Sequence, residues 1–176
     1  MSGRHLVLVG LMGAGKTSVG QRCARLLDRS FVDTDELVVA TTGMTVNELF
    51  ASGGESRFRE LERTAVADAC ASPEPLVIAC GGGAVLDPEN RSRLRTAGLV
   101  VWLQAPPDVL GARVSDDTRR PLLRNAGAAT LERLAVLRAP AYEDAADVTV
   151  DTAGRSIEDV ADLVIERWSA AQRSEP

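Results

Sequence analysis

The stretch Gly10-Leu11-Met12-Gly13-Ala14-Gly15-Lys16-Thr17 fits the pattern G-x-x-x-x-G-K-[ST] at every fixed position. The apolar run before it, residues 6–9, is typical of a buried parallel strand, and residues 18–27 after it predict a helix. A glycine-rich turn that opens a helix directs several backbone N–H groups at one anion. The stretch therefore predicts a phosphate-binding loop.

The residue types within this loop suit a nucleotide. Gly13 and Gly15 permit backbone conformations that are closed to residues with a Cβ atom. Lys16 can reach the β- and γ-phosphates, and the Thr17 hydroxyl can ligate Mg²⁺. We therefore expect the phosphates of a nucleotide to be held by Gly13, Ala14, Gly15, Lys16, Thr17 and Ser18.

The rest of the chain alternates between predicted strands and predicted helices. This alternation indicates an α/β protein with the three-layer P-loop NTPase fold, in which a five-stranded, mainly parallel sheet has helices on both faces. Ligands then bind at the carboxyl ends of the strands. The expected strands are 6–9, 31–32, 76–79, 99–103 and 148–150, and the expected helices are 18–27, 34–43, 45–50, 55–71, 88–98, 106–114, 130–144 and 156–171.

Composition narrows the class of protein. The length of 176 residues fits one domain, residues 1–176, and the net charge of −5 argues against a general nucleic-acid binder. No apolar run approaches the roughly 20 residues that span a membrane. The three cysteines form no C-x-x-C pair, so we expect reduced thiols and a cytoplasmic protein. The absence of an apolar surface stripe favours a monomer.

Residues 115–126 are polar and irregular, and they carry several charged side chains together with Pro121. Loops of this length and composition are often functional lids. We therefore predict a mobile lid over this segment.

Two aspartates follow the second expected strand. The third strand ends in Cys80-Gly81 without the usual magnesium-binding carboxylate, so Asp33, at the end of the second strand, is the nearest substitute. We expect it to hold Mg²⁺ through water. Asp35 suits the task of orienting an acceptor hydroxyl and taking its proton. We expect both to lie next to the first strand. The alternative is that they are solvated residues at a helix start.

Two further groups point to the acceptor side of the site. Arg59 and Glu62 stand at i and i+3 on one helix, so an ion pair can direct the arginine. Gly81–Gly83 offer bare backbone after a buried strand, where a closely approaching ligand would explain three glycines. The alternatives are a surface salt bridge and a flexible turn.

Together these residues resemble the shikimate kinases. The similarity covers nearly the whole chain, and the ordered combination of motifs is far more specific than the phosphate loop alone. The motifs are G-L-M-G-A-G-K-T at 10–17, D-T-D at 33–35, G-E-S-R-F-R-E-L-E at 54–62, G-G-G at 81–83, R-R-P-L-L at 119–123, R-A-P-A-Y at 138–142 and V-D-T at 150–152.

The resemblance implies a reaction and a set of roles. ATP would phosphorylate the 3-hydroxyl of shikimate, giving shikimate 3-phosphate and ADP in the pathway to aromatic amino acids. Lys16, Asp35 and Arg120 would be catalytic, with Asp35 as base and Arg120 bridging the transferring phosphate. Shikimate would be bound by Asp35, Arg59, Gly81, Gly82, Gly83 and Arg138, the adenine by Arg113 and Arg155, and Mg²⁺ by Thr17 with Asp33.

Two alternatives to this function stay open at this point. One is another small-molecule kinase, such as a gluconate or nucleoside-monophosphate kinase. The other is a nucleotide-binding domain without catalysis, which would be expected to lose Lys16, Asp35 or Arg120. A switch GTPase is disfavoured because the chain has no N-K-x-D motif. Cys80 departs from the family pattern, and the sequence leaves open whether it is a mildly reactive thiol near the site.

Overall fold

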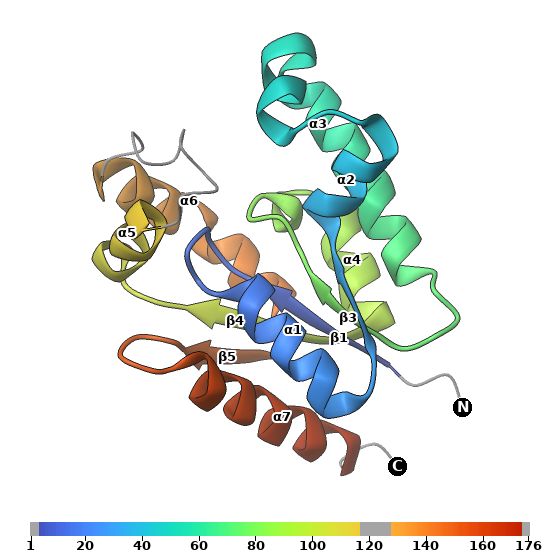
Figure 1. The fold of residues 1–176 in the computed structure, drawn as a ribbon, viewed down its shortest axis with the longest axis vertical. Coiled ribbons are helices and arrows are strands. Elements are labelled where there is room, and N and C mark those ends of the chain that lie inside the picture. The colour runs from blue at the N-terminus through green and yellow to red at the C-terminus, as the bar shows by residue number, and fades with distance from the viewer. Residues whose placement is uncertain (1–3, 117–127, 174–176) are drawn as a thin grey trace.

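The computed structural model describes residues 4–116 and 128–173. Within them, the chain forms one parallel sheet of five strands in the order β2-β3-β1-β4-β5 (Figure 1). The predicted α/β fold and parallel sheet are therefore confirmed. The strands are β1 His5–Val9, β2 Ser30–Asp33, β3 Leu76–Ala79, β4 Gly98–Gln104 and β5 Val148–Asp151.

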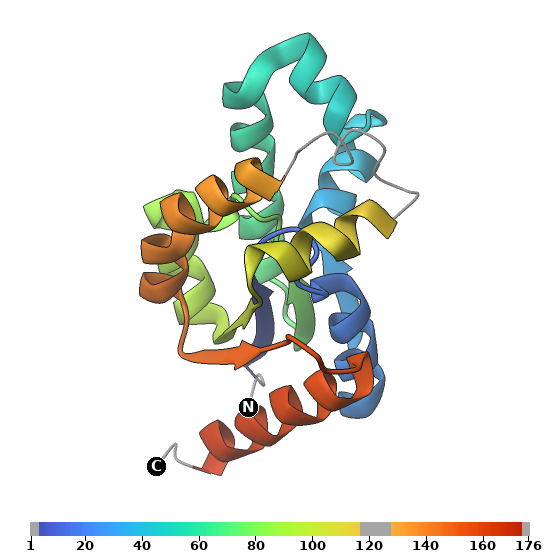
Figure 2. The ribbon, with the colours of Figure 1, turned by 90° about the vertical axis from the view of Figure 1, so that its left-hand side faces the viewer.

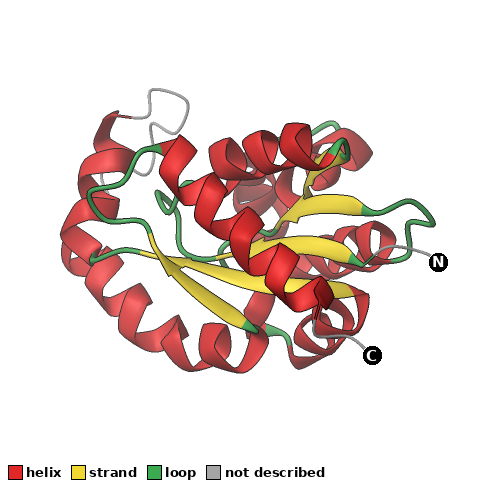
Figure 3. Cartoon of the chain, turned by 90° about the horizontal axis from the view of Figure 1, so that it is seen from below, coloured by secondary structure: helices red, strands yellow, loops and turns green. Residues whose placement is uncertain are grey.

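Helices cover both faces of this sheet. Helices α1 and α7 pack together on one face, and α4 and α6 contact the opposite face (Figures 1 and 3). Helix α3 extends beyond the sheet at the end opposite α7, which is clear in both side views (Figures 1 and 2). The helices are α1 Lys16–Leu27, α2 Thr34–Thr42, α3 Val46–Cys70, the 3₁₀ turn η1 Ala84–Leu86, α4 Pro88–Ala97, α5 Pro107–Asp116, α6 Ala128–Ala145 and α7 Ile157–Arg173.

The position of β2 corrects one expectation. We expected Asp33 and Asp35 to lie next to the first strand, but β3 stands between β2 and β1. Asp33 is in register with Ala79, the last residue of β3. The reason is that pairing in a parallel sheet depends on where each crossover returns, and no local pattern encodes that. As a consequence, the two aspartates lie beside the triple glycine that follows β3.

Helix α3 has a bend where the sequence predicted a break. Residues 45–50 and 55–71 were expected as two helices, and α3 consists of two helical segments that meet at Gly54, whose φ of 71° and ψ of −179° are not helical. The predicted capping box at the start is confirmed, because the Thr45 side chain accepts from the Glu48 backbone and Glu48 caps in return. The bend separates an outer turn from the longer arm that carries the site residues.

The first two residues of the predicted lid segment are helical. Ser115 and Asp116 belong to α5, since the helix continues to Asp116 and does not end at residue 114. The remaining lid residues, 117–126, lie outside the described residues. Across the described ranges, no helix is long and apolar enough to cross a membrane.

Two apolar clusters hold the elements in place. The larger cluster contains the sheet strands and the helices on both faces. A smaller one joins α2 to α3 and consists of Val38, Leu49, Phe58 and Ala65. Burial of an apolar side chain of this size contributes on the order of 1.5–3 kcal/mol. The smaller cluster therefore fixes α2 and α3 as a unit that carries Asp35, Arg59 and Glu62.

Candidate active site

The phosphate loop joins β1 to α1 and has the backbone that its glycines predict. Gly13 has φ 80° and Gly15 has φ 92°, both in the left-handed region. A Cβ atom on Gly13 would lie 2.7 Å from the Leu110 carbonyl oxygen. The Lys16 ammonium donates to the carbonyls of Gly10 and Leu11, at 2.8 and 3.0 Å, so it lies folded along the loop.

The two predicted magnesium residues come together. The Thr17 hydroxyl donates to one oxygen of Asp33 at 3.1 Å, and the other Asp33 oxygen accepts from the Asp35 backbone at 3.0 Å. Asp33 is therefore both the N-cap of α2 and a neighbour of the phosphate loop. A hydroxyl beside a carboxylate provides the hard oxygen ligands that Mg²⁺ prefers, so this pair fits the metal.

The triple glycine lies in the middle of the predicted acceptor residues. Gly81 donates its backbone N–H to the Thr34 hydroxyl at 3.0 Å. A Cβ atom on Gly81 would lie 2.5 Å from an Asp35 oxygen and 2.8 Å from a Glu62 oxygen. One on Gly82 would lie 3.4 Å from the guanidinium of Arg138, and one on Gly83 would lie 2.6 Å from Cζ of Arg59. Residues from α2, α3 and α6 thus converge on one bare turn.

Arg59 and Glu62 form the ion pair that their spacing predicts. The Arg59 guanidinium donates to Glu62 at 2.6 Å, and to Glu55 on the exposed side at 3.2 Å. Burial alone would lower the pKa of Arg59, but the two glutamates raise it overall. Burial raises the pKa of Glu62 above its ordinary range, and the nearby Asp35 adds to this, against the opposing effect of Arg59. Glu62 is only 2% exposed, so it acts as a buried anchor for the arginine.

The sequence analysis missed two residues that touch the triple glycine. Thr34 is fully buried and accepts from Gly81, and Tyr142 donates from its hydroxyl to the Gly82 carbonyl at 2.5 Å. Tyr142 follows Arg138 by four residues in the motif R-A-P-A-Y, and that spacing places the two side chains on one helix face. This spacing could have predicted that Tyr142 lies near the site, whereas nothing in the sequence marks Thr34 as a contact of the triple glycine.

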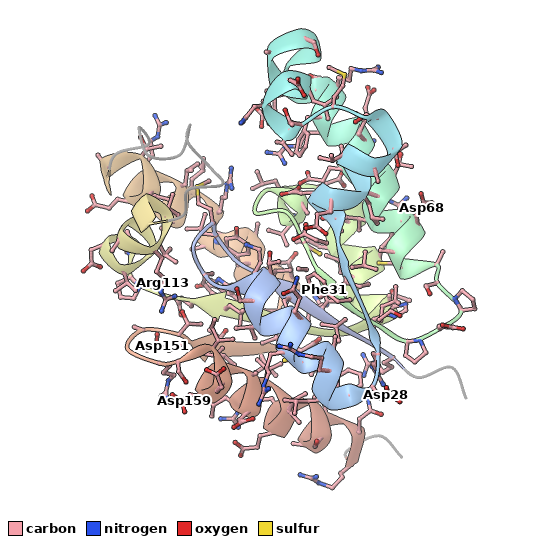
Figure 4. All side chains as sticks on the ribbon, in the orientation of Figure 1. Asp28, Phe31, Asp68, Arg113, Asp151 and Asp159 are labelled. Atoms are coloured by element: carbon pink, nitrogen blue, oxygen red, sulfur yellow. The ribbon has the colours of Figure 1, made fainter. Side chains whose placement is uncertain are left out.

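Arg113 links the phosphate loop to the loop after β5. Its guanidinium donates to the Gly13 carbonyl at 3.3 Å, and to the hydroxyl and carbonyl of Thr152 at 2.9 and 2.7 Å. Figure 4 shows Arg113 on α5 close to Asp151, the last residue of β5. Arg155 is exposed in the same loop, and its backbone N–H donates to Thr152 at 3.4 Å. The two arginines predicted for the adenine therefore border one loop beside Gly13.

The remaining expectations have different outcomes. Arg120 lies outside the described residues, so its role stays a prediction. The question that the sequence left open about Cys80 is answered by its burial: the side chain is 1% exposed, and burial raises the pKa of its thiol well above the ordinary value. The thiolate is the reactive form of cysteine, so a buried, protonated thiol is inert.

Comparison with known proteins decides the family. The shikimate kinase family model matches residues 12–169. The chain belongs to the shikimate kinase family. A shikimate kinase of Symbiobacterium thermophilum is 48% identical over 166 residues, which are 93% of this chain and 95% of that protein. One of Geobacter sulfurreducens is 48% identical over 161 residues, or 90% of this chain and 87% of the other.

A solved structure agrees with this assignment. The shikimate kinase from Acinetobacter baumannii in complex with shikimate superposes with a TM-score of 0.90 at 33% identity, covering 98% of this chain and 96% of that one. The prediction of an ATP-using kinase of this family is therefore confirmed. The two alternatives, a different small-molecule kinase and a non-catalytic domain, are disfavoured.

Proposed function

We propose that this shikimate kinase family member transfers the γ-phosphoryl group of ATP to the 3-hydroxyl of shikimate through the residues gathered at the triple glycine. The observation that carries the proposal is the convergence of Asp35, Arg59 and Arg138 on Gly81–Gly83, opposite the phosphate loop. That arrangement places one carboxylate and two guanidinium groups around a turn without side chains. The guanidinium groups can bind the carboxylate of a small polyhydroxylated acid, and the carboxylate can bind its hydroxyls.

The two arginines account for binding of the substrate carboxylate. A guanidinium matches a planar carboxylate with two parallel hydrogen bonds. The Nε of Arg138 is buried and has no hydrogen-bond partner among the residues that the structure describes. Glu62 holds Arg59 in one direction. The net charge of −5 would repel an anionic substrate, so these local cations are needed to attract it.

Asp35 is proposed to orient the acceptor hydroxyl and receive its proton. Its carboxylate lies against Gly81, where the missing side chain leaves the backbone accessible to a substrate. The N-terminal turn of α2 and the Asp33 cap fix its position. General-base catalysis of this kind contributes typically about 10²- to 10⁴-fold in rate.

The nucleotide is proposed to lie along the phosphate loop. The loop N–H groups and Lys16 would neutralise the phosphates, with Lys16 exchanging its loop carbonyls for phosphate oxygens. Arg113 and Arg155 would border the adenine. Mg²⁺ would be held by Thr17 and, through water, by Asp33, and when bound it would neutralise charge on the β- and γ-phosphates.

We also propose the conditions under which the enzyme works. ATP and shikimate are its partners, it acts as a monomer in the cytoplasm, and it engages neither nucleic acid nor membrane. The acidic net charge of −5 supports the absence of nucleic-acid binding.

The test measures turnover with several acceptors and the effect of one arginine substitution on KM. ADP release is measured with shikimate, gluconate and a panel of nucleoside monophosphates, and turnover is expected with shikimate. Arg138→Lys should raise the KM for shikimate roughly tenfold or more, because a buried charged hydrogen bond is worth about 1.5–3 kcal/mol, and leave the KM for ATP nearly unchanged. Arg133→Lys, at an exposed site on the same helix, is the matched control. Absence of shikimate-dependent turnover would refute the proposal.

A further inference from the structure

Tyr142 lies at the point where α6 meets the triple glycine, yet no binding or catalytic step of the proposed reaction uses its side chain. Its side chain is 1% exposed, and its ring stacks on Trp102 with centroids 5.4 Å apart and an interplanar angle of 20°. Its hydroxyl donates to the Gly82 carbonyl at 2.5 Å. Arg138 lies close enough to lower the pKa of this hydroxyl, against the effect of burial, and its guanidinium also borders Gly82. The buried hydroxyl thus lies beside the arginine at the glycine turn.

The direction of these hydrogen bonds is determined by chemistry. A tyrosine hydroxyl has one proton, and the Gly82 carbonyl can only accept, so the proton goes to that carbonyl. Arg138 can only donate, so it interacts with the hydroxyl through the oxygen lone pairs and not through the proton. Burial raises the pKa of Tyr142 to about 12, which keeps the proton in place at neutral pH. The result is a fixed orientation of the Tyr142 hydroxyl, with its proton on the Gly82 carbonyl and its lone pairs available to Arg138.

This chain sets the geometry of two parts of the acceptor site. In a trans peptide the carbonyl and the following N–H point in opposite directions. Holding the Gly82 carbonyl towards Tyr142 therefore turns the Gly83 N–H to the opposite side. Gly82 also lies between Arg138 and the phosphate loop, since a Cβ atom there would be 3.4 Å from Arg138 and 3.5 Å from the Gly10 carbonyl oxygen.

We propose that Tyr142 is a positioning residue for the acceptor: its hydroxyl holds Arg138 and the Gly82–Gly83 peptide in the arrangement that receives the substrate carboxylate. The inference rests on the proposed function, because it acts through Arg138. It makes Tyr142 a determinant of acceptor affinity and not of phosphoryl transfer itself. The aromatic ring provides packing, and the hydroxyl provides the alignment.

The first experiment removes the hydroxyl alone. Tyr142→Phe keeps the stack on Trp102 but leaves Arg138 and the Gly82 carbonyl without their shared partner. The KM for shikimate should rise roughly tenfold, since an unsatisfied buried polar group costs about 1–3 kcal/mol, while kcat and the KM for ATP change less than about twofold. A shikimate analogue lacking the carboxylate should show no such rise. The matched control is Trp102→Phe, which weakens the stack, should lower Tm, and should leave the KM for shikimate unchanged.

A double-mutant cycle with Arg138→Lys tests whether the effect passes through the arginine. The combined rise in KM should be smaller than the product of the two single effects, because both changes disrupt the same contact. A multiplicative result, an unchanged KM in Tyr142→Phe, or an equal effect on ATP and shikimate would overturn the inference. If the unaltered enzyme fails to phosphorylate shikimate at all, the proposed function and this inference fall together. Normal wild-type turnover with an unaffected Tyr142→Phe refutes the inference alone.

A second measurement does not depend on the variant folding. Tyr142 is the only tyrosine in the chain, so 3-fluorotyrosine incorporation labels this site alone. The fluorine resonance should shift when shikimate is added and stay in place with the carboxylate-free analogue, because only the carboxylate engages Arg138. A fluorine chemical shift that does not change when shikimate is added, in an enzyme with normal turnover, would overturn the inference.

Discussion

The nucleotide side and the acceptor side of the site are held by different means. Around the phosphate loop, the backbone itself is the scaffold: left-handed glycines shape the turn, and Lys16 and Arg113 bind its carbonyls. On the acceptor side, the charged side chains of Asp35, Arg59 and Arg138 come from three helices and meet at a turn with no side chains of its own. The first is a local structure that one stretch of sequence builds. The second exists only when distant helices pack correctly.

The two sides of the site are also supported by different apolar clusters. The loop sits on the main core, among strands whose side chains are almost fully buried. Asp35, Arg59 and Glu62 depend on the smaller cluster between α2 and α3. A binding surface carried by a small apolar cluster can be altered by changes that leave the sheet intact. Substitutions on the two sides should therefore separate acceptor affinity from nucleotide affinity.

The largest expected effect comes from removing the proposed base on the acceptor side. Asp35→Asn should lower kcat by about 10²- to 10⁴-fold, because the acceptor proton then has no carboxylate to receive it. Shikimate should still bind, since both arginines remain. Steady-state ADP release gives kcat, and calorimetry gives the Kd for shikimate. Glu36→Gln, an exposed acid in the same helical turn, is the control. A retained kcat would remove Asp35 from the chemistry.

A pair of glycine substitutions should separate the two sides directly. Gly13→Ala forces a Cβ atom onto φ 80° and towards the Leu110 carbonyl, with strain of about 1–3 kcal/mol, so the KM for ATP should rise roughly tenfold. Gly83 has an ordinary φ of −102°, so alanine fits its backbone. The nearest atoms to a Cβ atom there belong to the guanidinium of Arg59, at the end of a flexible side chain. Gly83→Ala should instead raise the KM for shikimate by about the same factor, since Arg59 is displaced from the substrate carboxylate.

Gly43→Ala is the control for backbone strain in that pair. Gly43 also has a left-handed φ, 68°, but a Cβ atom there would have no neighbour within 4 Å. Its substitution should cost about 1–2 kcal/mol of stability and alter neither KM. If Gly13→Ala and Gly83→Ala raise both KM values equally, the two sides are not independent.

The smallest expected effect concerns the buried glutamate that anchors Arg59. Burial raises the pKa of Glu62, so the folded protein binds a proton there more readily than the unfolded chain does. Its contribution to the free energy of unfolding therefore falls as pH rises from the unfolded glutamate pKa, about 4.3, through the higher folded value. Glu62→Gln removes this proton linkage. The Tm difference, variant minus wild type, should become more positive as pH rises over this range.

Glu55→Gln provides the comparison for this pH effect. Glu55 pairs with the same arginine, but its side chain is 67% exposed. Thermal melts of the three proteins across the same pH series should give a sloping Tm difference for Glu62→Gln, and Glu55→Gln shows how the loss of an exposed partner of Arg59 changes Tm. A constant Tm difference for Glu62→Gln would contradict the raised pKa of Glu62 in the folded protein.

The sequence predicted the local parts of the molecule well. The phosphate loop, the capping box at Thr45 and the Arg59–Glu62 pair each lie within one short window, and each was confirmed. Local backbone preferences and i, i+3 geometry determine such features before any tertiary contact forms. The alternation of strands and helices likewise predicted the α/β class. Residues 117–126 remain a predicted lid.

Other features required the packed chain. The place of β2 at the sheet edge was predicted wrongly and the burial of Cys80 was not predicted, because both depend on which segments return to which position. The contacts of Thr34 and Tyr142 with the triple glycine join residues 47 and 60 positions apart. The sequence by itself determined a phosphate loop and the residue types of an acceptor site. Only the tertiary structure decided which arginine, carboxylate and hydroxyl meet at Gly81–Gly83, because no local preference couples segments that far apart.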